Sequence, residues 1–353
     1  MQEVRHWLLV WSWWWRPEKD SQRGASHLFY FYFYHVLTLA ATRGNVKCGK
    51  LTFQKLKLAA VDIGSNAIRL QVTNVTYYQQ KATFKKVEYV RFPLRLGKDV
   101  FHHQKICETN KKKFVKLMHA FRLLIDLYEV DDYLICATSA MREADNGAEI
   151  VEEVKKDCGL TINIIDGDRE ADLINIALKS HIDHKTYLHI DVGGGSTELN
   201  IYKNTEKVAS HSFRLGSVRT LDGQVSPEVW DTMTNFIQRH LGKKESITCI
   251  GTGGNINKIF ELSKPSNKKR YLDIAKIHEV LGHLESFTYE ERINILNLNP
   301  DRADVIIPAA RIYLAAMNAA HSKRMLVPDV GLKDGLISVL YERNKEKILR
   351  TER

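Results

Sequence analysis

The sequence has few of the features that mark metal-thiolate or membrane-spanning proteins. Its five cysteines include no Cys-x-x-Cys pair and no cluster with histidine at zinc-binding spacing. The aromatic-rich apolar stretch at residues 28–41 is shorter than the roughly 20 residues that a helix needs to cross a bilayer. These absences indicate a reducing compartment, so we expect a cytoplasmic protein with no stable membrane association.

A strong excess of positive charge is also missing from most of the chain, although the formal net charge is +10. Residues 1–58 hold nine Lys/Arg against three Asp/Glu, which places +6 there, and the other 295 residues carry only +4. The body therefore lacks the basic surface that nucleic-acid binding requires. We expect no nucleic-acid partner.

The first 55 residues differ in composition from the rest. Five of the six tryptophans lie between Trp7 and Trp15, and an alternating Phe/Tyr run spans residues 29–34. Three interpretations stay open: a non-native extension, a real but disordered tail, or a membrane-surface anchor built from aromatic and basic residues. We set residues 1–55 apart and expect two domains, 56–175 and 176–353, with the last helix able to pack back on the first domain.

Strand and helix patterns alternate from residue 58 onward. Residues 58–63 and 68–75 are typical of two strands joined by a tight turn, and residues 187–192 and 198–202 repeat that arrangement. Apolar residues at helical spacing within 105–128 predict a helix, as they do at 227–240. This mixture predicts an α/β protein.

One internal similarity suggests how the halves are related. Leu58–Asn66 and Leu188–Ser196 each show a buried strand, an aspartate at its end, one apolar residue, and a glycine turn that leads into a second strand. Two copies, one in each half, favour a duplicated fold whose halves face each other across a cleft.

The two glycine turns are candidates for phosphate binding, because successive backbone N–H groups form a nest for anions. Asp62 and Asp191 would lie beside these nests. A carboxylate repels a phosphate unless a cation lies between them, so the pattern implies Mg²⁺. An Asp-x-Gly turn alone is equally typical of ordinary turn chemistry. Gly253 and Gly254, which follow an apolar strand, form a further but weaker candidate nest at a helix start.

Three other side chains could carry chemistry. Glu198 could hold a metal or orient water, or could simply face solvent on its strand. Glu170 lies in the first turn of a helix, where the dipole favours acids, but with Asp168 as N-cap a capping box would need Glu at position 171, which is alanine. Arg142 is equally well explained as a phosphate ligand and as a solvated helix residue.

Taken together, these motifs resemble the Ppx/GppA phosphatases, the family of exopolyphosphatases and guanosine pentaphosphate phosphohydrolases. The matching segments are Ala60–Asn66, Ala137–Arg142, Asp191–Glu198 and Gly251–Gly254, in the family's order and spacing over about residues 57–345, and Gly331–Gly335 resembles its closing motif. The resemblance implies a duplicated actin-like, or sugar-kinase, α/β fold with two domains around an active-site cleft.

The resemblance also implies roles for individual residues. It makes Glu170 the general base, in a segment where the family usually shows two adjacent acids and this chain has Arg169 first. It makes Asp191 and Glu198 the ligands of Mg²⁺. The phosphate-binding residues that follow from the match are Asp62, Gly64, Ser65, Asn66, Arg69, Arg142, Gly193, Gly194, Gly195, Ser196, Thr197, Gly253 and Gly254.

The function implied is hydrolysis of terminal phosphoanhydride bonds, as processive release of orthophosphate from inorganic polyphosphate. Guanosine pentaphosphate is the alternative substrate. A non-hydrolytic, actin-like nucleotide-binding regulatory module is the alternative of another class, which Glu170 and the Asp191/Glu198 pair disfavour; a sugar kinase is disfavoured because no sugar-binding segment is visible. The chain stops at Arg353, so we expect the short form without a C-terminal HD-type domain, and a homodimer is compatible with the sequence.

Overall fold

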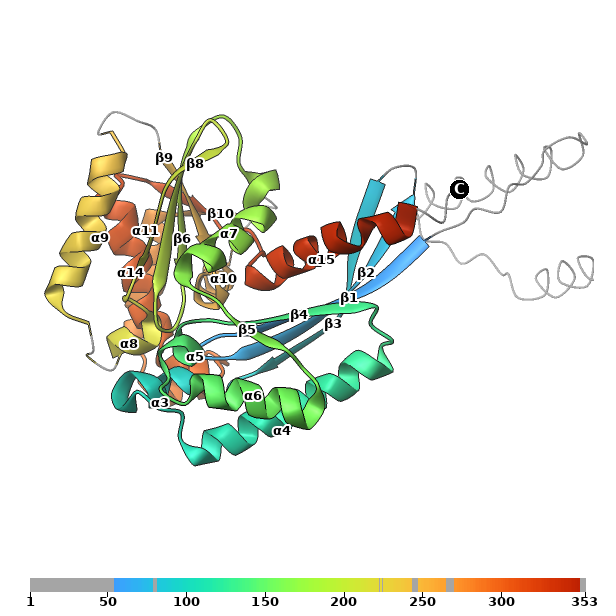
Figure 1. Ribbon diagram of the computed structural model, residues 1–353. Helices are drawn as coiled ribbons and strands as arrows, with labels where there is room; N and C mark the ends of the chain where they lie inside the picture. Colours follow the sequence, from blue (N-terminus) through green and yellow to red (C-terminus); the bar gives the residue numbers. More distant parts are fainter. Residues whose placement is uncertain are drawn as a thin grey trace, which may run out of the picture. The chain divides into compact units, whose positions relative to one another are not determined.

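The computed structural model describes residues 54–78, 81–221, 223, 225–242, 247–264 and 270–349 (Figure 1). Residues 53–353 form one compact unit. The interpretations of the N-terminal extension fall on residues outside the described ranges, apart from its last two positions. Among the helices in those ranges, none combines the length and the apolar character needed to cross a membrane.

The first half of this unit is built on a five-stranded sheet with the order β3-β2-β1-β4-β5. Strands β1, β2 and β3 pair antiparallel in sequence order, β4 is parallel to β1, and β5 is parallel to β4. The strands are β1 (Gln54–Ile63), β2 (Ile68–Tyr78), β3 (Lys81–Phe92), β4 (Asp132–Ala137) and β5 (Ile162–Ile164).

The second half repeats this topology in a six-stranded sheet with the order β10-β11-β9-β6-β7-β8. Here β6, β7 and β8 form the antiparallel meander, β9 is parallel to β6, and β11 is parallel to β9. The strands are β6 (Thr186–Val192), β7 (Thr197–Lys203), β8 (Glu206–Phe213), β9 (Ile247–Thr252), β10 (Tyr271–Asp273) and β11 (Arg324–Leu326). The repeated strand–turn–strand motif of the sequence therefore marks a repeated sheet.

Helices cover both faces of each sheet. In the first half they are α3 (Leu96–His103), α4 (Glu108–Leu127), α5 (Ser139–Glu143) and α6 (Gly147–Cys158). In the second half they are α8 (Ser217–Leu221), α9 (Pro227–His240), α10 (Gly254–Leu262), α11 (Ile274–Glu285), α12 (Tyr289–Asn294), α13 (Pro300–Ala303) and α14 (Ile306–Ala319). Two further helices, α7 (Gly167–Leu178), which continues into the 3-10 turn η1 (Lys179–His181), and α15 (Leu332–Leu349), contact each other.

The layers follow from the alternation of side chains along the strands. On β1, the odd-numbered residues from Ala59 to Ile63 pack in one core cluster with apolar residues of α4 and α6. Leu58 and Ala60 face the opposite side, where they share a cluster with α7, α15 and Tyr187 of the second sheet. Thus α7 and α15 fill the layer between the two sheets, and α15 crosses over β1 (Figure 1). The proposed domain boundary at residues 175/176 falls within α7.

The same alternation determines where the acidic residues point. Asp62 continues the inner face of Leu58 and Ala60, and Asp191 and Glu198 lie on the inner faces of β6 and β7 in the same way. All three occupy strand ends, where the apolar layer between the sheets stops. The fold therefore collects at one place three carboxylates that are far apart in the sequence.

A glycine on α15 permits the close packing of the two central helices. A Cβ at Gly335 would overlap the backbone carbonyl of Leu173 on α7, whereas no atom lies within 4 Å of a Cβ at Gly331. We expect Gly335→Ala to lower the free energy of unfolding by about 1–3 kcal/mol, because backbone cannot yield as a side chain can. Gly331→Ala is the matched control and should change it by less than about 0.5 kcal/mol. Denaturant unfolding of both variants checks this, and equal midpoints would contradict it.

Candidate active site

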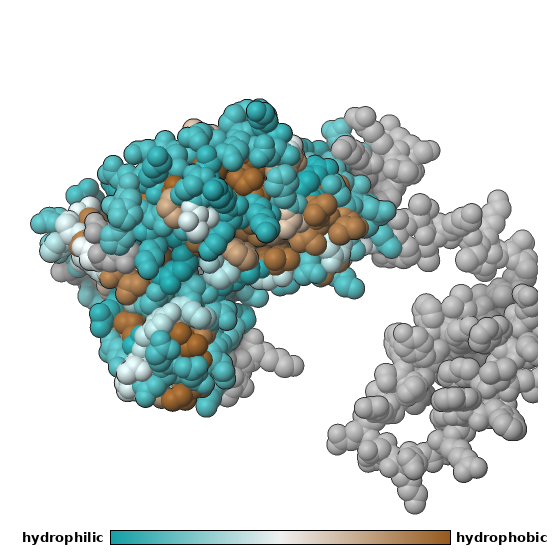
Figure 2. Space-filling view, turned by 90° about the horizontal axis from the view of Figure 1, so that it is seen from below, coloured by the Kyte–Doolittle hydropathy of each residue, from teal (hydrophilic) through white to brown (hydrophobic). Residues whose placement is uncertain are grey.

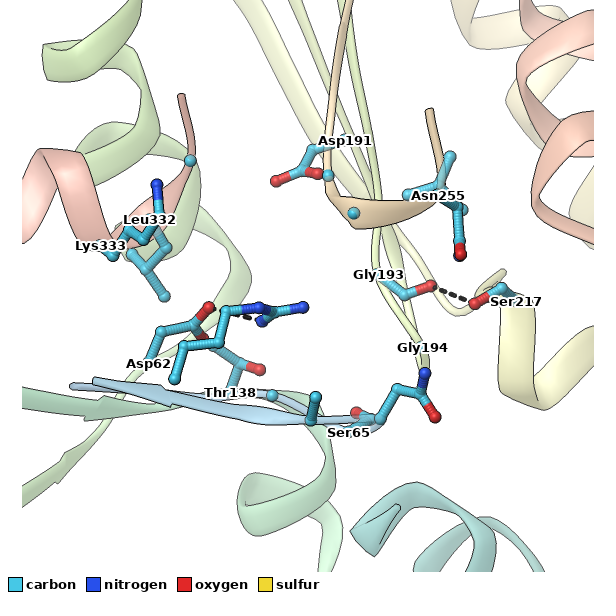
Figure 3. Close-up of a pocket in the computed structure, with 18 of the residues that line it drawn as sticks. Asp62, Ser65, Thr138, Asp191, Gly193, Gly194, Ser217, Asn255, Leu332 and Lys333 are labelled. Atoms are coloured by element: carbon cyan, nitrogen blue, oxygen red, sulfur yellow. Dashed lines mark hydrogen bonds and ion pairs between the residues drawn. The ribbon is translucent and has the colours of Figure 1, made fainter. Parts of the chain in front are cut away.

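One cavity of about 170 Å³ lies where the ends of the two sheets meet (Figure 3). Asp62 and Asp191 enter it from opposite halves, and Lys333 enters from the start of α15. Its lining also includes Gly64, Ser65, Asn66, Arg69, Tyr89, Arg91, Thr138, Ser139, Glu170, Gly193, Gly194, Ser196, Gly253, Gly254, Asn255, Asn257, Arg302, Asp329 and Val330. The cleft expected between the halves is thus present, and most of the predicted site residues border it.

The two glycine turns are built alike and touch each other. In the first, the N–H of Gly64 donates to the carbonyl of Ala67 at 3.2 Å; in the second, the N–H of Gly193 donates to the carbonyl of Ser196 at 2.9 Å. A Cβ at Gly194 would lie 2.9 Å from the Cβ of Ser65. Any side chain at position 194 would therefore push the turns apart, which explains the glycine there.

Glu170 enters the cleft from the start of α7. The N-cap of this helix is Asp166, whose Oδ1 accepts from the N–H of Arg169 at 2.7 Å, so the expectation that Asp168 caps it is wrong. Two aspartates flank Gly167, and the sequence alone favours neither as the cap. The N–H of Glu170 donates to the carbonyl of Asp166 at 3.0 Å, whereas its side chain takes no part in the cap. Its Oε2 is buried and has no hydrogen-bond partner.

The acidic residues of the cleft raise one another's pKa. Burial first, and then the charges of Glu198, Asp191 and Asp62, raise the pKa of Glu170 well above its ordinary value. Burial raises the pKa of Asp191 to about 6, and burial with the charge of Asp191 raises the pKa of Glu198 to about 7. Asp62 instead pairs with Arg69 at 2.7 Å. Near neutral pH this cluster is poised to exchange protons or to accept a cation.

Cations line the other side of the cleft. Arg69 and Arg91 face each other in the register of β2 and β3, and Arg302 lies on α13. Burial and the charge of Arg91 lower the pKa of Arg302, with a smaller contribution from Arg69, so both of these arginines repel Arg302. Arg91 is paired with Asp301. A cluster of guanidinium groups in a cavity favours the binding of an anion with several negative oxygens.

Four of the predicted site residues do not line this cavity. Glu198 is only 2% exposed and lies behind Asp191, where its Oε1 accepts from Ser212 at 2.9 Å. The hydroxyl of Thr197 is buried and donates to the carbonyl of Leu215. The other two contribute to a second cavity: Arg142 lines it, and the carbonyl of Gly195 accepts from Arg219, which also lines it.

Several cleft residues were missed by sequence reasoning. Arg91 lies on an edge strand, Arg302 lies on a helix of four residues, and neither belongs to a local motif. Asn255 and Asn257 directly follow the Gly253-Gly254 turn, and Lys333 lies in the Gly331–Gly335 segment, so attention to the residues around each glycine could have found these three.

The cluster fits a divalent cation held by few protein ligands. Asp191 and Glu198 are directly opposite each other in the β6–β7 register, and like charges in that position are destabilising. Within the described ranges, no three acidic, histidine or cysteine side chains converge on a preformed metal site. Mg²⁺ commonly takes only one or two carboxylates and completes its shell with water and phosphate oxygens. The donor set is therefore compatible with Mg²⁺.

The raised pKa of Glu198 predicts a pH-dependent penalty on folding in metal-free protein. Because the folded-state pKa of about 7 lies above the ordinary glutamate value of 4.5, the folded protein binds the extra proton and loses stability as pH rises through this interval. We expect Glu198→Gln to gain stability over wild type, on the order of 1–3 kcal/mol, between pH 5 and 7.5 in EDTA. Glu149, whose pKa is lowered by Lys111, is the control: Glu149→Gln should show no such gain. Thermal unfolding across pH measures both, and parallel curves for wild type and Glu198→Gln would contradict it.

The duplicated topology and the cleft between the repeats define the actin-like, sugar-kinase class of fold. An exopolyphosphatase structure from Cytophaga hutchinsonii supports this, with a TM-score of 0.70 over 82% of this chain and 98% of that one, at 21% identity. The predicted fold class is therefore confirmed.

The chain belongs to the Ppx/GppA phosphatase family, whose model matches residues 75–344. It is 28% identical over 277 residues to a bifunctional 3-dehydroquinate synthase/phosphatase of Fusobacterium nucleatum, and 23% identical over 293 residues to a guanosine-5'-triphosphate,3'-diphosphate pyrophosphatase of Aliivibrio fischeri. These matches cover 70% and 79% of this chain but only 41% and 58% of the relatives.

Proposed function

We propose that this chain hydrolyses terminal phosphoanhydride bonds and releases orthophosphate from a linear polyanion. The observation that carries the proposal is the unpartnered carboxylate oxygen of Glu170 in a cavity bounded by two mirrored glycine turns. Membership of the phosphatase family agrees with it.

In this proposal Glu170 is the general base. Its raised pKa, caused by burial and by the neighbouring carboxylates, makes the Glu170 carboxylate a stronger proton acceptor than an ordinary glutamate. It would take a proton from a water directed at the terminal phosphorus. The backbone of Gly194, together with Arg69 and Arg302, would stabilise the charge on the phosphoryl oxygens, which is the main contribution expected in phosphoryl transfer.

Asp191 and Glu198 would hold Mg²⁺. When bound, the cation would neutralise charge on the phosphate oxygens and relieve the repulsion between the two carboxylates. Asp62 is held away by its pairing with Arg69, so its proposed contribution is to orient that guanidinium toward the phosphate.

Inorganic polyphosphate is the substrate that the lining favours. Arg69, Arg91, Arg302 and Lys333 supply repeated positive charge, which suits a chain of identical phosphates. A nucleotide base needs an apolar or aromatic slot, and among the described lining residues Tyr89 is the only aromatic one. Guanosine pentaphosphate remains the second candidate, because Tyr89 could stack on guanine and a relative carries a matching name.

A cytoplasmic location is part of the proposal. It is supported by the four described cysteines, Cys107, Cys136, Cys158 and Cys249, which are all free thiols.

The test is the release of orthophosphate by the purified chain from polyphosphates of several lengths, guanosine pentaphosphate and ATP, each with Mg²⁺ or with EDTA. We expect Mg²⁺-dependent release with the highest kcat/KM on polyphosphate. Release only from guanosine pentaphosphate would select the second candidate. Binding of these compounds without release from any of them would support a regulatory module instead.

A further inference from the structure

A second cavity of about 370 Å³ lies between the two halves, apart from the cleft. Residues of α3 and α5 form one side of it, and residues of the β8–α8 segment form the other; these elements lie together in Figure 1. Its lining is Val100, Phe101, Gln104, Arg142, Glu143, Arg214 and Arg219.

The charge in this second cavity is strongly unbalanced. Glu143 is the only acidic residue in its lining and accepts from Arg219 at 2.8 Å through both oxygens, and from Arg214 at 2.8 Å. Arg142 is the third arginine, and its Nη1 donates to a backbone carbonyl. One carboxylate among three guanidinium groups leaves two positive charges uncompensated. Such a cavity favours a small dianion with several acceptor oxygens.

The site is built rather than a chance gathering of surface side chains. Arg219 is 5% exposed, its guanidinium stacks on Phe101 at 4.0 Å from the ring centroid, and its Nε donates to the carbonyl of Gly195 at 2.9 Å. Phe101 and Ser139 leave no room for a side chain at Gly195, so the backbone carbonyl that Arg219 contacts lies in a closely packed environment. The pairing of Arg219 with Glu143 offsets the cost of burying its charge and holds the guanidinium group at the cavity.

The second glycine turn contributes to the walls of both cavities. Gly193, Gly194 and Ser196 line the cleft, whereas the carbonyl of Gly195 between them faces Arg219. Arg142 lines the second cavity, yet its charge reaches the other side of this wall and opposes the rise in the pKa of Glu170 and Glu198. The second cavity therefore adjoins the carboxylate end of the cleft, where the proposed reaction takes place.

We propose that this arginine-lined cavity is an orthophosphate site, which binds the product while a polyanion occupies the cleft. The inference rests on the proposed function. Orthophosphate is a small dianion with four acceptor oxygens, which matches the two uncompensated positive charges of the cavity. Arg214, with a side chain 74% exposed, makes the site accessible from solvent.

Orthophosphate inhibition of polyphosphate hydrolysis tests the proposal. If orthophosphate binds the second cavity while the chain occupies the cleft, inhibition of the wild type is noncompetitive with the chain. Arg214→Gln should raise the inhibition constant about fivefold, since one charge-assisted contact is lost at a partly solvated site, and Arg214→Lys should restore most of it. Arg311→Gln is the matched control, because Arg311 is also an exposed arginine that donates to a single glutamate, Glu285. The proposal would be overturned if orthophosphate inhibited the wild type purely competitively and with the same inhibition constant as in Arg214→Gln.

A binding measurement separates this proposal from the proposed function. Titration of inorganic phosphate into the full chain needs no turnover, and we expect two sites in each protein, with one of them bound about fivefold more weakly in Arg214→Gln than in the wild type and in Arg311→Gln. That result would support the orthophosphate site even if the chain hydrolysed no polyphosphate. Identical stoichiometry and affinity in wild type and Arg214→Gln would eliminate it even if hydrolysis were robust.

Discussion

Glu170→Gln should lower kcat for orthophosphate release by about 10²–10⁴-fold, the range expected when a general base is removed. The amide has nearly the same shape as the carboxylate but cannot accept a proton. Because Oε2 has no partner in the folded protein, the substitution breaks no hydrogen bond through that atom. We therefore expect KM for polyphosphate to change little while kcat collapses.

The variant should also show how the cleft charges interact. With the charge at position 170 removed, Asp191 and Glu198 lose one repulsive neighbour, so the metal-free variant should unfold at a higher temperature than metal-free wild type near neutral pH. Loss of activity with gain of stability is the pattern of a catalytic group and not of a structural one.

Asp168→Asn provides the matched control, because Asp168 is an exposed acid in the first turn of the same helix that does not line the cleft. It should retain wild-type kcat. Steady-state kinetics of both variants on one polyphosphate length give the comparison. A Glu170→Gln enzyme with near wild-type kcat would assign the base elsewhere.

The parts of this site that sequence reasoning identified are those encoded within a few consecutive residues. Asp62 and Asp191 each lie at the end of a buried strand, two residues before the first glycine of a turn, and this local pattern can be recognised without knowledge of the fold. The duplication was visible for the same reason, since both copies keep the strand, the acid and the turn in one contiguous segment.

The parts that were missed depend on pairing between distant segments. Arg91 reaches the cleft only because β3 pairs with β2 in a register that sets it opposite Arg69. Arg302 lies on α13, which is more than 200 residues along the chain from Arg91. Thr197 illustrates the converse: it belongs to a glycine-rich motif, yet its strand position buries it and commits its hydroxyl to Leu215.

Arg142 shows how a motif can identify a residue without giving its direction. The sequence left it open between a phosphate ligand and a solvated helix residue. In the fold, Arg142 donates to the carbonyl of Ile165 at 2.7 Å and lines the second cavity. Its charge also opposes the rise in the pKa of Glu170. The choice depended on how α5 packs against the other half, which no local pattern encodes.

Asp191→Asn should remove most Mg²⁺-dependent activity, at least about 10²-fold, because it deletes one of only two carboxylates proposed to hold the cation. It should also abolish stabilisation by Mg²⁺. For the wild type, Mg²⁺ at ten times its dissociation constant should add about 1.4 kcal/mol to the free energy of unfolding. For the variant, Mg²⁺ should add nothing to the free energy of unfolding beyond the effect of ionic strength.

The direction in which Asp191→Asn changes the melting temperature in EDTA makes this experiment decisive. Burial and the charge of Asp62 raise the pKa of Asp191 to about 6, so at pH 7.5 the ionised aspartate destabilises the metal-free fold, and Asp191→Asn should melt above metal-free wild type. Addition of Mg²⁺ should then raise the melting temperature of the wild type but leave that of the variant unchanged. NaCl at matched ionic strength is the control for screening. If Mg²⁺ stabilised Asp191→Asn as much as wild type, the cation would bind away from the two carboxylates. The geometry at the end of β6 would then serve only to hold the glycine turn.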